Sequence, residues 1–231
     1  MRPLFIVVRI LGAALIVAAM VVQIANNFAQ WTRLGITHLE NIPINFFSYF
    51  TIDSNVGTVI VFVIGAVVLL RKRDDPRWFG ILRACVVSYM TVTGIVYNTL
   101  LRGIPVPLNA VVPWTNEVLH VVGPVLIILD WLFAPGRLRL EWKHLWWVVS
   151  FPIVWAVYTM IRGPFAYNDV AQKRTWYPYP FLDPNTPGSE GYVTVAFYVV
   201  LIAAIICGVG AAVIWVSRRR ARWPLPAPAA A

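Results

Sequence analysis

A histidine inside an apolar run is the residue of this sequence best suited to chemistry. His120 lies in the run 116–134, and a neutral imidazole can accept a proton at ambient pH. On a helix, Asn116 shares the face of His120 at a spacing of four residues, and Glu117 neighbours it at a spacing of three. Histidine is rare inside apolar spans, so we expect His120 to have a functional role.

Polar residues recur with helical spacing in two further apolar runs, 46–70 and 79–101. They are Ser48, Thr51, Asn55 and Thr58 in the first run, and Thr91, Asn98 and Arg102 in and just after the second. Such a polar face must contact protein or water rather than lipid. The runs bring these groups to a similar depth, so we expect one common cavity lined by Ser48, Thr51, Asn98 and His120. In the structural alternative, Ser48, Thr58 and Thr91 only form hydrogen bonds between helices.

The composition places these runs in a membrane. Of the 231 residues, 59% are hydrophobic and 13% are charged, against roughly 25% charged residues in soluble domains. A spanning helix needs about 20 mostly apolar residues, and six runs fit: 4–25, 46–70, 79–101, 116–134, 145–161 and 191–216. We predict an all-α polytopic membrane protein, with a six-helix domain at 1–223 and a flexible Pro/Ala tail at 224–231.

The loops between the runs predict the orientation. Lys and Arg number 12 on one side and 5 on the other, and the richer side of a membrane protein faces the cytoplasm. Both termini are therefore predicted to be cytoplasmic. The basic residues that set this orientation also explain the net charge of +9, so no nucleic-acid partner is expected. The long connections 26–45 and 162–190 would then lie on the outer face, where elaborated loops often accompany a site.

Charged residues inside the runs predict ion pairs. Arg83 and Asp130 lie toward the cytoplasmic ends of their spans, so we expect them to pair with each other or with a loop charge. Arg9 lies near the end of the first span and is expected to snorkel toward the interface. Cys85 and Cys207 have neither CxxC spacing nor a nearby histidine, which indicates packing residues. No metal or cofactor is expected.

Three motifs resemble those of a known family of intramembrane enzymes. They are Tyr49-Phe50-Thr51, Asn116-Glu117-Val118-Leu119-His120 and Trp176-Tyr177-Pro178-Tyr179-Pro180-Phe181-Leu182-Asp183. They are similar to motifs of the androgen-induced-protein family of hydrolases, and more closely to its bacterial branch, the Pr-six-Pr integral membrane proteins. The resemblance covers most of the chain in order and span count, and the Tyr-Pro-Phe-Leu block is its most specific part.

The resemblance implies a multi-pass enzyme of the bacterial plasma membrane that hydrolyses fatty acid esters of hydroxy fatty acids or similar lipid esters. By motif, Thr51 would be the nucleophile and His120 its base, and a weak threonine nucleophile does need a base within about 3 Å. The residues expected to contact substrate are Ser48, Asn55, Asn98, Arg102, Asn116, Glu117, Tyr179, Phe181 and Asp183. Glu117 stands where animal members have a histidine, a change that would alter the tautomer or charge of His120.

The outer loop that carries the third motif is expected to fold back over the cavity, because its four aromatic residues avoid water. Asp183 would then pair with Arg102 or Arg162, each of which lies at the outer end of a span. The same aromatic residues also fit an ordinary interfacial belt.

Two other functions remain open on these residues. A non-enzymatic binder, carrier or sensor of a lipophilic ligand would use the polar cluster to hold a head group. A purely structural protein would use the cluster to hold helices together. For the enzyme and the binder alike, the partner is a membrane lipid or a lipophilic small molecule, and the oligomeric state is left open.

Overall fold

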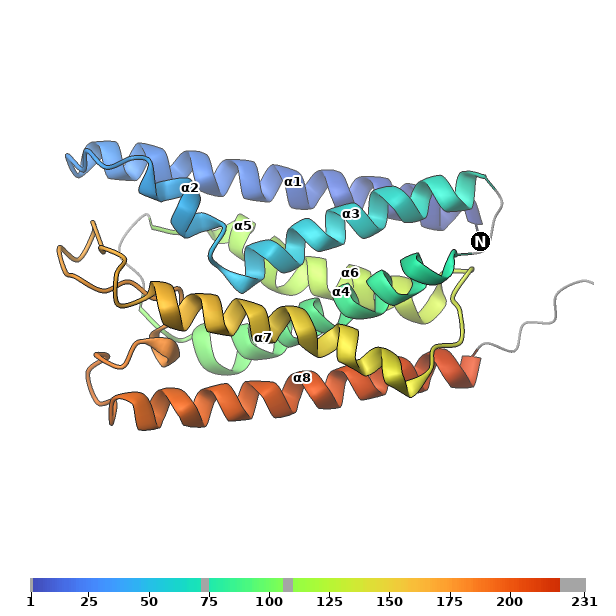
Figure 1. Cartoon of the computed structure of the whole chain (residues 1–231). Coiled ribbons are helices and arrows are strands. Elements are labelled where there is room, and N and C mark those ends of the chain that lie inside the picture. The colour runs from blue at the N-terminus through green and yellow to red at the C-terminus, as the bar shows by residue number, and fades with distance from the viewer. Residues whose placement is uncertain (1, 72–74, 106–109, 221–231) are drawn as a thin grey trace, which may run out of the picture.

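Six helices that are long and apolar enough to cross a membrane form the bundle of the computed structural model, which describes residues 2–71, 75–105 and 110–220 (Figure 1). They are α1 (Arg2–Arg33), α3 (Phe50–Leu70), α4 (Arg77–Val96) with η1 (Tyr97–Leu101), α5 (Pro113–Glu117) with η2 (Val118–Val122) and α6 (Gly123–Phe133), η3 (Trp142–His144) with α7 (Leu145–Arg162), and α8 (Tyr192–Arg220). Two short elements, α2 (Asn41–Phe46) and η4 (Pro180–Leu182), lie in the connections. The described ranges contain no strand, so the predicted all-α membrane fold is confirmed.

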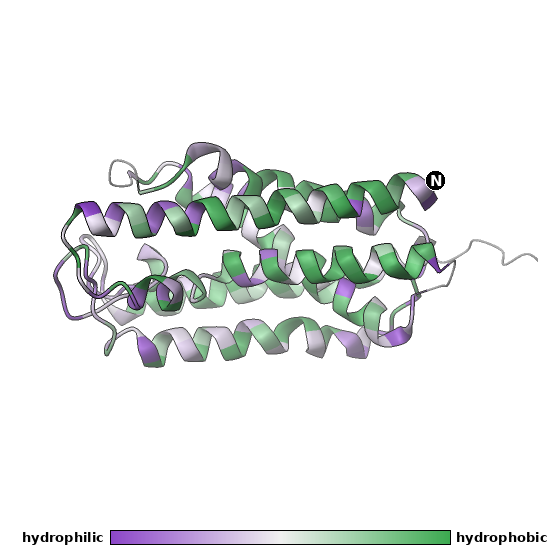
Figure 2. Ribbon diagram, turned by 90° about the horizontal axis from the view of Figure 1, so that it is seen from above, coloured by the Kyte–Doolittle hydropathy of each residue, from purple (hydrophilic) through white to green (hydrophobic). Residues whose placement is uncertain are grey.

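The two ends of the bundle differ in composition. Helix α1 begins and α8 ends at the same end (Figure 1), which we call the basic end. The connections 34–49 and 163–191 lie at the opposite end, which we call the loop end. Figure 2 shows the hydrophilic residues gathered toward both ends, with apolar helix surface between them. That distribution matches a layer of lipid around the middle of the bundle. The predicted 1–223 domain and the 224–231 tail extend beyond the described residues.

The second span begins later than its apolar pattern predicts. Helix α3 starts at Phe50, because residues 47–49 form a turn after α2. Ser48 therefore does not lie on the α3 face that carries Thr51 and Asn55, although the sequence spacing places it there. Its hydroxyl donates to the Ile44 carbonyl at 2.7 Å instead.

Two spans contain a widened π-helical turn near the loop end. One is η1, which continues α4, and the other is η2, which separates α5 from α6. Pro124 follows η2 closely, and a proline within a helix lacks an N–H and clashes with the carbonyl four residues earlier, here that of His120. A wider turn relieves that clash. Single π turns are frequent at functional sites.

A buried ion network joins the helices at the basic end. Asp130 on α6 accepts from Arg9 on α1, with Nε to Oδ1 at 2.7 Å and a terminal guanidinium nitrogen to Oδ2 at 3.0 Å. Arg83 on α4 reaches Asp130 Oδ2 at 2.9 Å and also pairs with Asp75, which lies just before α4. All four side chains are at most 3% exposed. The predicted pairing of Arg83 with Asp130 is confirmed.

The expectation that Arg9 snorkels is wrong. Its side chain is fully buried, and its guanidinium lies against Gly65 of α3, where an added Cβ would be 2.5 Å from the guanidinium nitrogen Nη1. Glycine at 65 therefore gives the guanidinium room to reach Asp130. A bidentate contact with a carboxylate compensates for the loss of water around a buried arginine.

Candidate functional site

An apolar cavity of about 320 Å³ lies between α3, α4, α7 and α8. This volume falls at the lower end of the range of small-molecule sites. Its wall is formed by Phe50, Thr51, Val92, Thr93, Val96, Tyr97, Leu101, Trp146, Val149, Pro152, Ile153, Trp155, Ala156, Tyr179, Phe181, Leu182, Val199, Ile202, Ala203, Ile206 and Cys207. Hydrophobic side chains dominate this wall, and two threonine and two tyrosine hydroxyls interrupt it.

Thr51 lies on this wall in the first turn of α3, where its hydroxyl meets a tyrosine from the outer loop. Tyr179 Oη is 3.1 Å from Thr51 Oγ1 and also accepts from the Thr51 backbone N–H at 3.1 Å. Both residues are buried. Burial raises the pKa of Tyr179, so its phenol keeps its proton at neutral pH and can donate a hydrogen bond. Two residues from separate predicted motifs are therefore in contact.

Thr93 adds a second polar point to the same wall. Its side chain is 5% exposed, and within the described residues its Oγ1 has no hydrogen-bond partner. A buried hydroxyl without a partner is costly and rare in native proteins. Its position on the wall of a cavity means that a bound molecule can supply the missing partner. No pattern in the sequence distinguishes Thr93 from Thr91, whose hydroxyl donates to Val87.

His120 lies on η2 and stacks on Tyr97 of η1. The two rings are 4.2 Å apart between centroids with an interplanar angle of 27°. His120 Nδ1 is 2.9 Å from the Asn116 carbonyl oxygen, and because a carbonyl only accepts, Nδ1 must carry a proton. In the neutral ring Nε2 is then the unprotonated nitrogen, which is the state required of a base.

Asn116 contacts both rings of this stacked pair. Its Nδ2 donates to Tyr97 Oη at 2.5 Å, so Asn116 orients both members of the stacked pair. The contact between the two π turns was not predicted, since Tyr97 belongs to no motif or polar stripe of the sequence. Its position directly before Asn98, which was predicted to line the cavity, was the one feature that pointed to Tyr97.

Thr51 and His120 are close to one another but not in contact. Asn55 Nδ2 donates to the Thr51 carbonyl at 2.8 Å and to the Leu119 carbonyl at 3.0 Å, which joins α3 to the turn that carries His120. No hydrogen bond between the Thr51 and His120 side chains occurs in the described part of the chain. Tyr97 lines the cavity, whereas His120 does not.

The expected common cavity therefore contains only part of the predicted set. Thr51, Tyr179 and Phe181 line it, but Ser48, Asn98 and His120 do not. Asn98 is exposed and its Nδ2 donates to the Gly94 carbonyl. It sits on η1, where the π turn shifts the helical register that placed it on the same face as Thr91.

Ser48 remains close to the site from the side of α7. Its Oγ is 3.0 Å from Tyr158 Oη, and its carbonyl accepts from Trp155 Nε1 at 3.1 Å. Because Trp155 lines the cavity, Ser48 helps to fix one wall.

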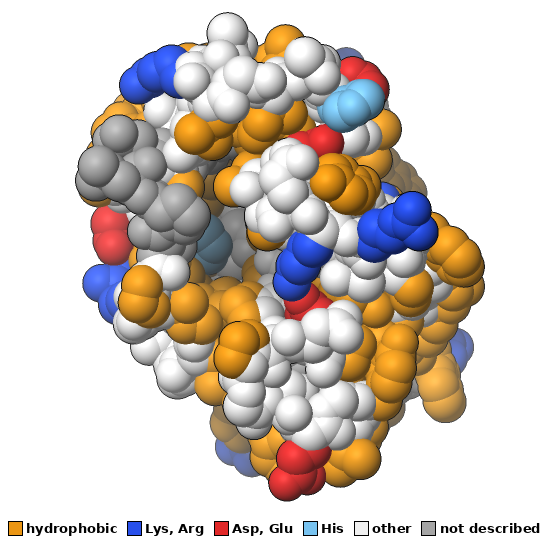
Figure 3. Space-filling model, turned by 90° about the vertical axis from the view of Figure 1, so that its left-hand side faces the viewer, with side chains coloured by type: hydrophobic (Ala, Val, Ile, Leu, Met, Phe, Trp, Pro, Cys, Tyr) orange, Lys and Arg blue, Asp and Glu red, His pale blue; other side chains and the backbone are white. Residues whose placement is uncertain are grey.

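The charged residues predicted to bind substrate pair with other groups at the loop end, seen face-on in Figure 3. Arg102 pairs with Glu117 at 2.8 Å, and both side chains are nearly half exposed. Asp183 pairs with Lys173 at 3.1 Å, not with Arg102 or Arg162 as expected. Arg162 donates to Asn45 at 2.6 Å instead.

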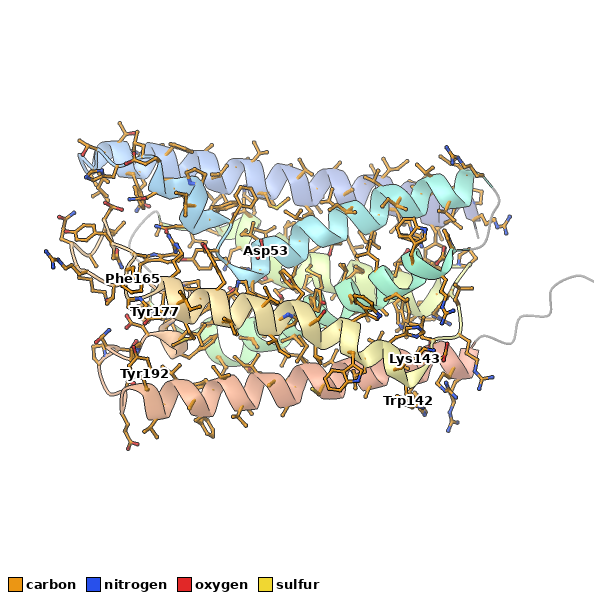
Figure 4. The ribbon with its side chains drawn as sticks, viewed as in Figure 1. Asp53, Trp142, Lys143, Phe165, Tyr177 and Tyr192 are labelled. Atoms are coloured by element: carbon orange, nitrogen blue, oxygen red, sulfur yellow. The ribbon has the colours of Figure 1, made fainter. Side chains whose placement is uncertain are left out.

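The outer loop does fold back over the bundle. Tyr179, Leu182 and Asp183 are at most 9% exposed, and Phe181 stacks on Tyr179 with centroids 5.2 Å apart. Tyr177 is 9% exposed, and Figure 4 shows both Tyr177 and Phe165 beside the end of α7. Phe165 is 87% exposed, so the loop contains both buried and belt-like aromatic residues.

Three residues near the site complete its description. Asp53, labelled in Figure 4, is half-buried in the first turn of α3. Cys85 is buried as predicted, whereas Cys207 is exposed and lines the cavity. Among the described residues no cluster of three or more metal-ligating side chains occurs.

Comparisons with known proteins add no further assignment. No protein-family model, curated protein or solved structure matches this chain.

Proposed function

We propose that this chain is an integral membrane hydrolase of lipid esters, with Thr51 as nucleophile and His120 as base. The observation that carries the proposal is the Thr51 hydroxyl at the polar end of an apolar intramembrane cavity. The motif resemblance supports the same two residues. Bacterial plasma membrane is the location that the resemblance and the loop charges favour.

The cavity suits an acyl chain that enters from the bilayer. Its wall includes Trp146 and Ile153, which are 75% and 56% exposed on the lipid-facing side of α7. From Trp146 to Ala156 the wall follows α7 for about 15 Å, at 1.5 Å per residue. A chain lying along α7 would have its ester near Thr51 and its end toward the basic end.

The site contains groups for each step of ester cleavage. Thr51 Oγ1 attacks the ester carbonyl carbon, and His120 Nε2 takes the hydroxyl proton. The protonated phenol of Tyr179 donates to the oxyanion that forms. The oxyanion collapses, the alcohol leaves with the proton from His120, and water then releases the acid from the threonine ester.

The base must approach the nucleophile when substrate binds, since the two side chains are not hydrogen bonded in the free protein. Catalytic hydrogen bonds often tighten only in the complex with substrate. The same gap favours a second candidate, a non-enzymatic binder or carrier. In that case Thr51 and Tyr179 only hold the polar group of the lipid.

Turnover and binding measured on the same variants separate the two candidates. We would incubate purified protein with a panel of long-chain lipid esters and measure released fatty acid. Binding would be followed by quenching of tryptophan fluorescence with dibromostearoyl esters. For the hydrolase, Thr51→Ala and His120→Ala each lower turnover by about a thousandfold, and the double variant is no worse, because a catalytic unit is not additive.

The matched control is Thr58→Ala. Thr58 is a buried threonine on the same helix whose hydroxyl donates to the Ser54 carbonyl, and it does not line the cavity. This variant should retain turnover and binding. Quenching without turnover in the wild type, weakened by Thr51→Ala, would identify a binder. A double variant much worse than either single one would exclude the shared nucleophile and base.

A further inference from the structure

A second cavity adjoins the first one at the loop end. It has a volume of about 240 Å³ and lies between the end of η1, the 180–189 stretch of the outer loop and the start of α8. Phe181 belongs to the walls of both cavities. Its ring stacks on Tyr179 on one side and packs against Tyr198 at 5.6 Å on the other. One side chain therefore separates the two spaces.

The second cavity has the chemistry of a site for an uncharged group. Among its described wall residues none is charged, and the polar ones are the hydroxyl residues Thr186, Ser189, Thr194 and Tyr198. Thr194 Oγ1 accepts from the Glu190 N–H at 2.9 Å, and no acceptor for its own proton is described. The nearby charges of Lys173 and Asp183 already neutralise each other.

From this geometry we propose that the second cavity holds the alcohol-derived part of the same ester, and that this part is uncharged. The inference rests on the proposed function, in which the acyl chain occupies the first cavity and the ester lies near Thr51. Tyr179 joins the two places, because its hydroxyl contacts Thr51 and its ring stacks on Phe181. Phe181 then sets how large the alcohol part can be.

An anionic alcohol part is disfavoured on physical grounds. A carboxylate placed against this wall would lose part of its water without gaining a cationic partner among the described wall residues, which is unfavourable. A neutral hydrocarbon or hydroxyl-bearing arm instead buries apolar surface against Leu100, Ile104 and Phe181. Each buried methylene strengthens binding several-fold.

The test compares three esters of dibromostearic acid, namely the methyl ester, the octyl ester and an octyl ester that ends in a carboxylate. Binding is measured by tryptophan quenching in detergent micelles, with Trp155→Phe to report the first cavity. We expect the wild-type protein to bind the octyl ester about tenfold more tightly than its carboxylate analogue. Equal affinity for the two would overturn the assignment of an uncharged arm.

Two variants examine the second cavity from different sides. Phe181→Trp enlarges the shared wall residue, and Thr194→Phe fills the second cavity from α8 without touching the first. Each should lower the ratio of octyl to methyl ester affinity by about tenfold. The matched control is Val193→Phe, which adds the same ring to α8 at a residue that is 67% exposed and lines neither cavity, and it should leave that ratio unchanged.

The outcomes separate the two proposals. If no ester binds, the proposed function fails and this inference fails with it. If the methyl ester binds normally but neither Phe181→Trp nor Thr194→Phe changes the ratio, the second cavity is not a ligand site. Should Phe181→Trp fold poorly, the comparison of Thr194→Phe with Val193→Phe still decides the question.

Discussion

The basic end and the loop end of the bundle handle polar groups in opposite ways. At the basic end, two arginines and two aspartates are buried and paired with one another. At the loop end, each of the pairs Arg102–Glu117 and Lys173–Asp183 has at least one partly exposed member, and the polar groups that line the cavity are hydroxyls of threonine and tyrosine. A buried charge network holds helices in place, whereas neutral hydroxyls can exchange one partner for another at low cost.

Unpaired atoms show the same contrast. The network leaves one guanidinium nitrogen of Arg9 and one oxygen of Asp75 without a described partner, each within a group that is otherwise bonded. The side chain of Thr93, at the cavity, has a single polar group, its hydroxyl, and this hydroxyl has no described partner. The first region is therefore suited to stability and the second to ligand binding.

Removing the shared carboxylate should break the basic end. Asp130→Asn leaves Arg9 and Arg83 with one uncompensated charge in a buried site, which destabilises the fold by about 3–5 kcal/mol. Unfolding in detergent, followed by circular dichroism, measures this loss. The control is Glu141→Gln, which removes two exposed pairs at the same end, with Arg77 and Lys143, and keeps a side-chain oxygen to cap η3. Exposed pairs contribute little, so its effect should be at most about 1 kcal/mol. Wild-type stability of Asp130→Asn would show that the network is not structural.

The space around Arg9 provides a milder test of the same region. Gly65→Ala places a methyl group against a guanidinium that Asp130 holds fixed, and such overpacking destabilises by about 1–3 kcal/mol. The matched control is Gly208→Ala on α8, where an added Cβ meets nothing within 4 Å. That variant should be neutral or slightly stabilising. Equal melting temperatures of the two variants would contradict tight packing at Arg9.

At the cavity we expect a smaller effect, a gain in stability instead of a loss. Thr93→Val keeps the volume and removes an unpaired buried hydroxyl, so the ligand-free protein should gain about 1 kcal/mol or less. Ligand binding should weaken if the ligand supplies the partner of Thr93. Thermal unfolding with and without a dibromostearoyl ester measures both effects. A variant that is destabilised without ligand would mean that the hydroxyl already has a partner.

The smallest expected effect is a loss of order in the outer loop at low pH. Burial by itself raises the pKa of Asp183, but hydrogen bonds from Asn185 and Lys173 outweigh it and hold the pKa below its usual value. A lowered pKa means that the contribution of Asp183 is complete above the unfolded value of about 3.9 and is lost as the pH falls below it. Cleavage of the 163–191 connection by pepsin should therefore accelerate below about pH 4. Asp183→Asn should weaken this pH dependence, and an unchanged profile would exclude Asp183 as its cause.

Run length and composition alone were enough to predict the six helices. A backbone surrounded by lipid must satisfy its own hydrogen bonds, so a run of about 20 apolar residues has few alternatives to a helix. The pairing of Arg83 with Asp130 was also predictable, because both lie at one depth and neither can remain unpaired there. The orientation of the bundle stays a prediction from the loop charges.

Other contacts depend on which helices are neighbours, which sequence spacing does not encode. Arg9 and Asp130 are 121 positions apart in the sequence. They meet because α1 packs beside α3 and α6. Lys173 rather than Arg102 meets Asp183, and this partner lies only ten positions away in the same outer loop.

The candidate site shows the same division. The sequence supplied Thr51 and His120, since polar groups in apolar runs stand out by type, and the motif resemblance supplied Tyr179. Tertiary structure alone determined that Thr51 meets Tyr179, that Tyr97 stacks on His120, and that Phe181 separates two cavities. Residue types limit which contacts are possible, but distances between helices are set by the packing of all their side chains together.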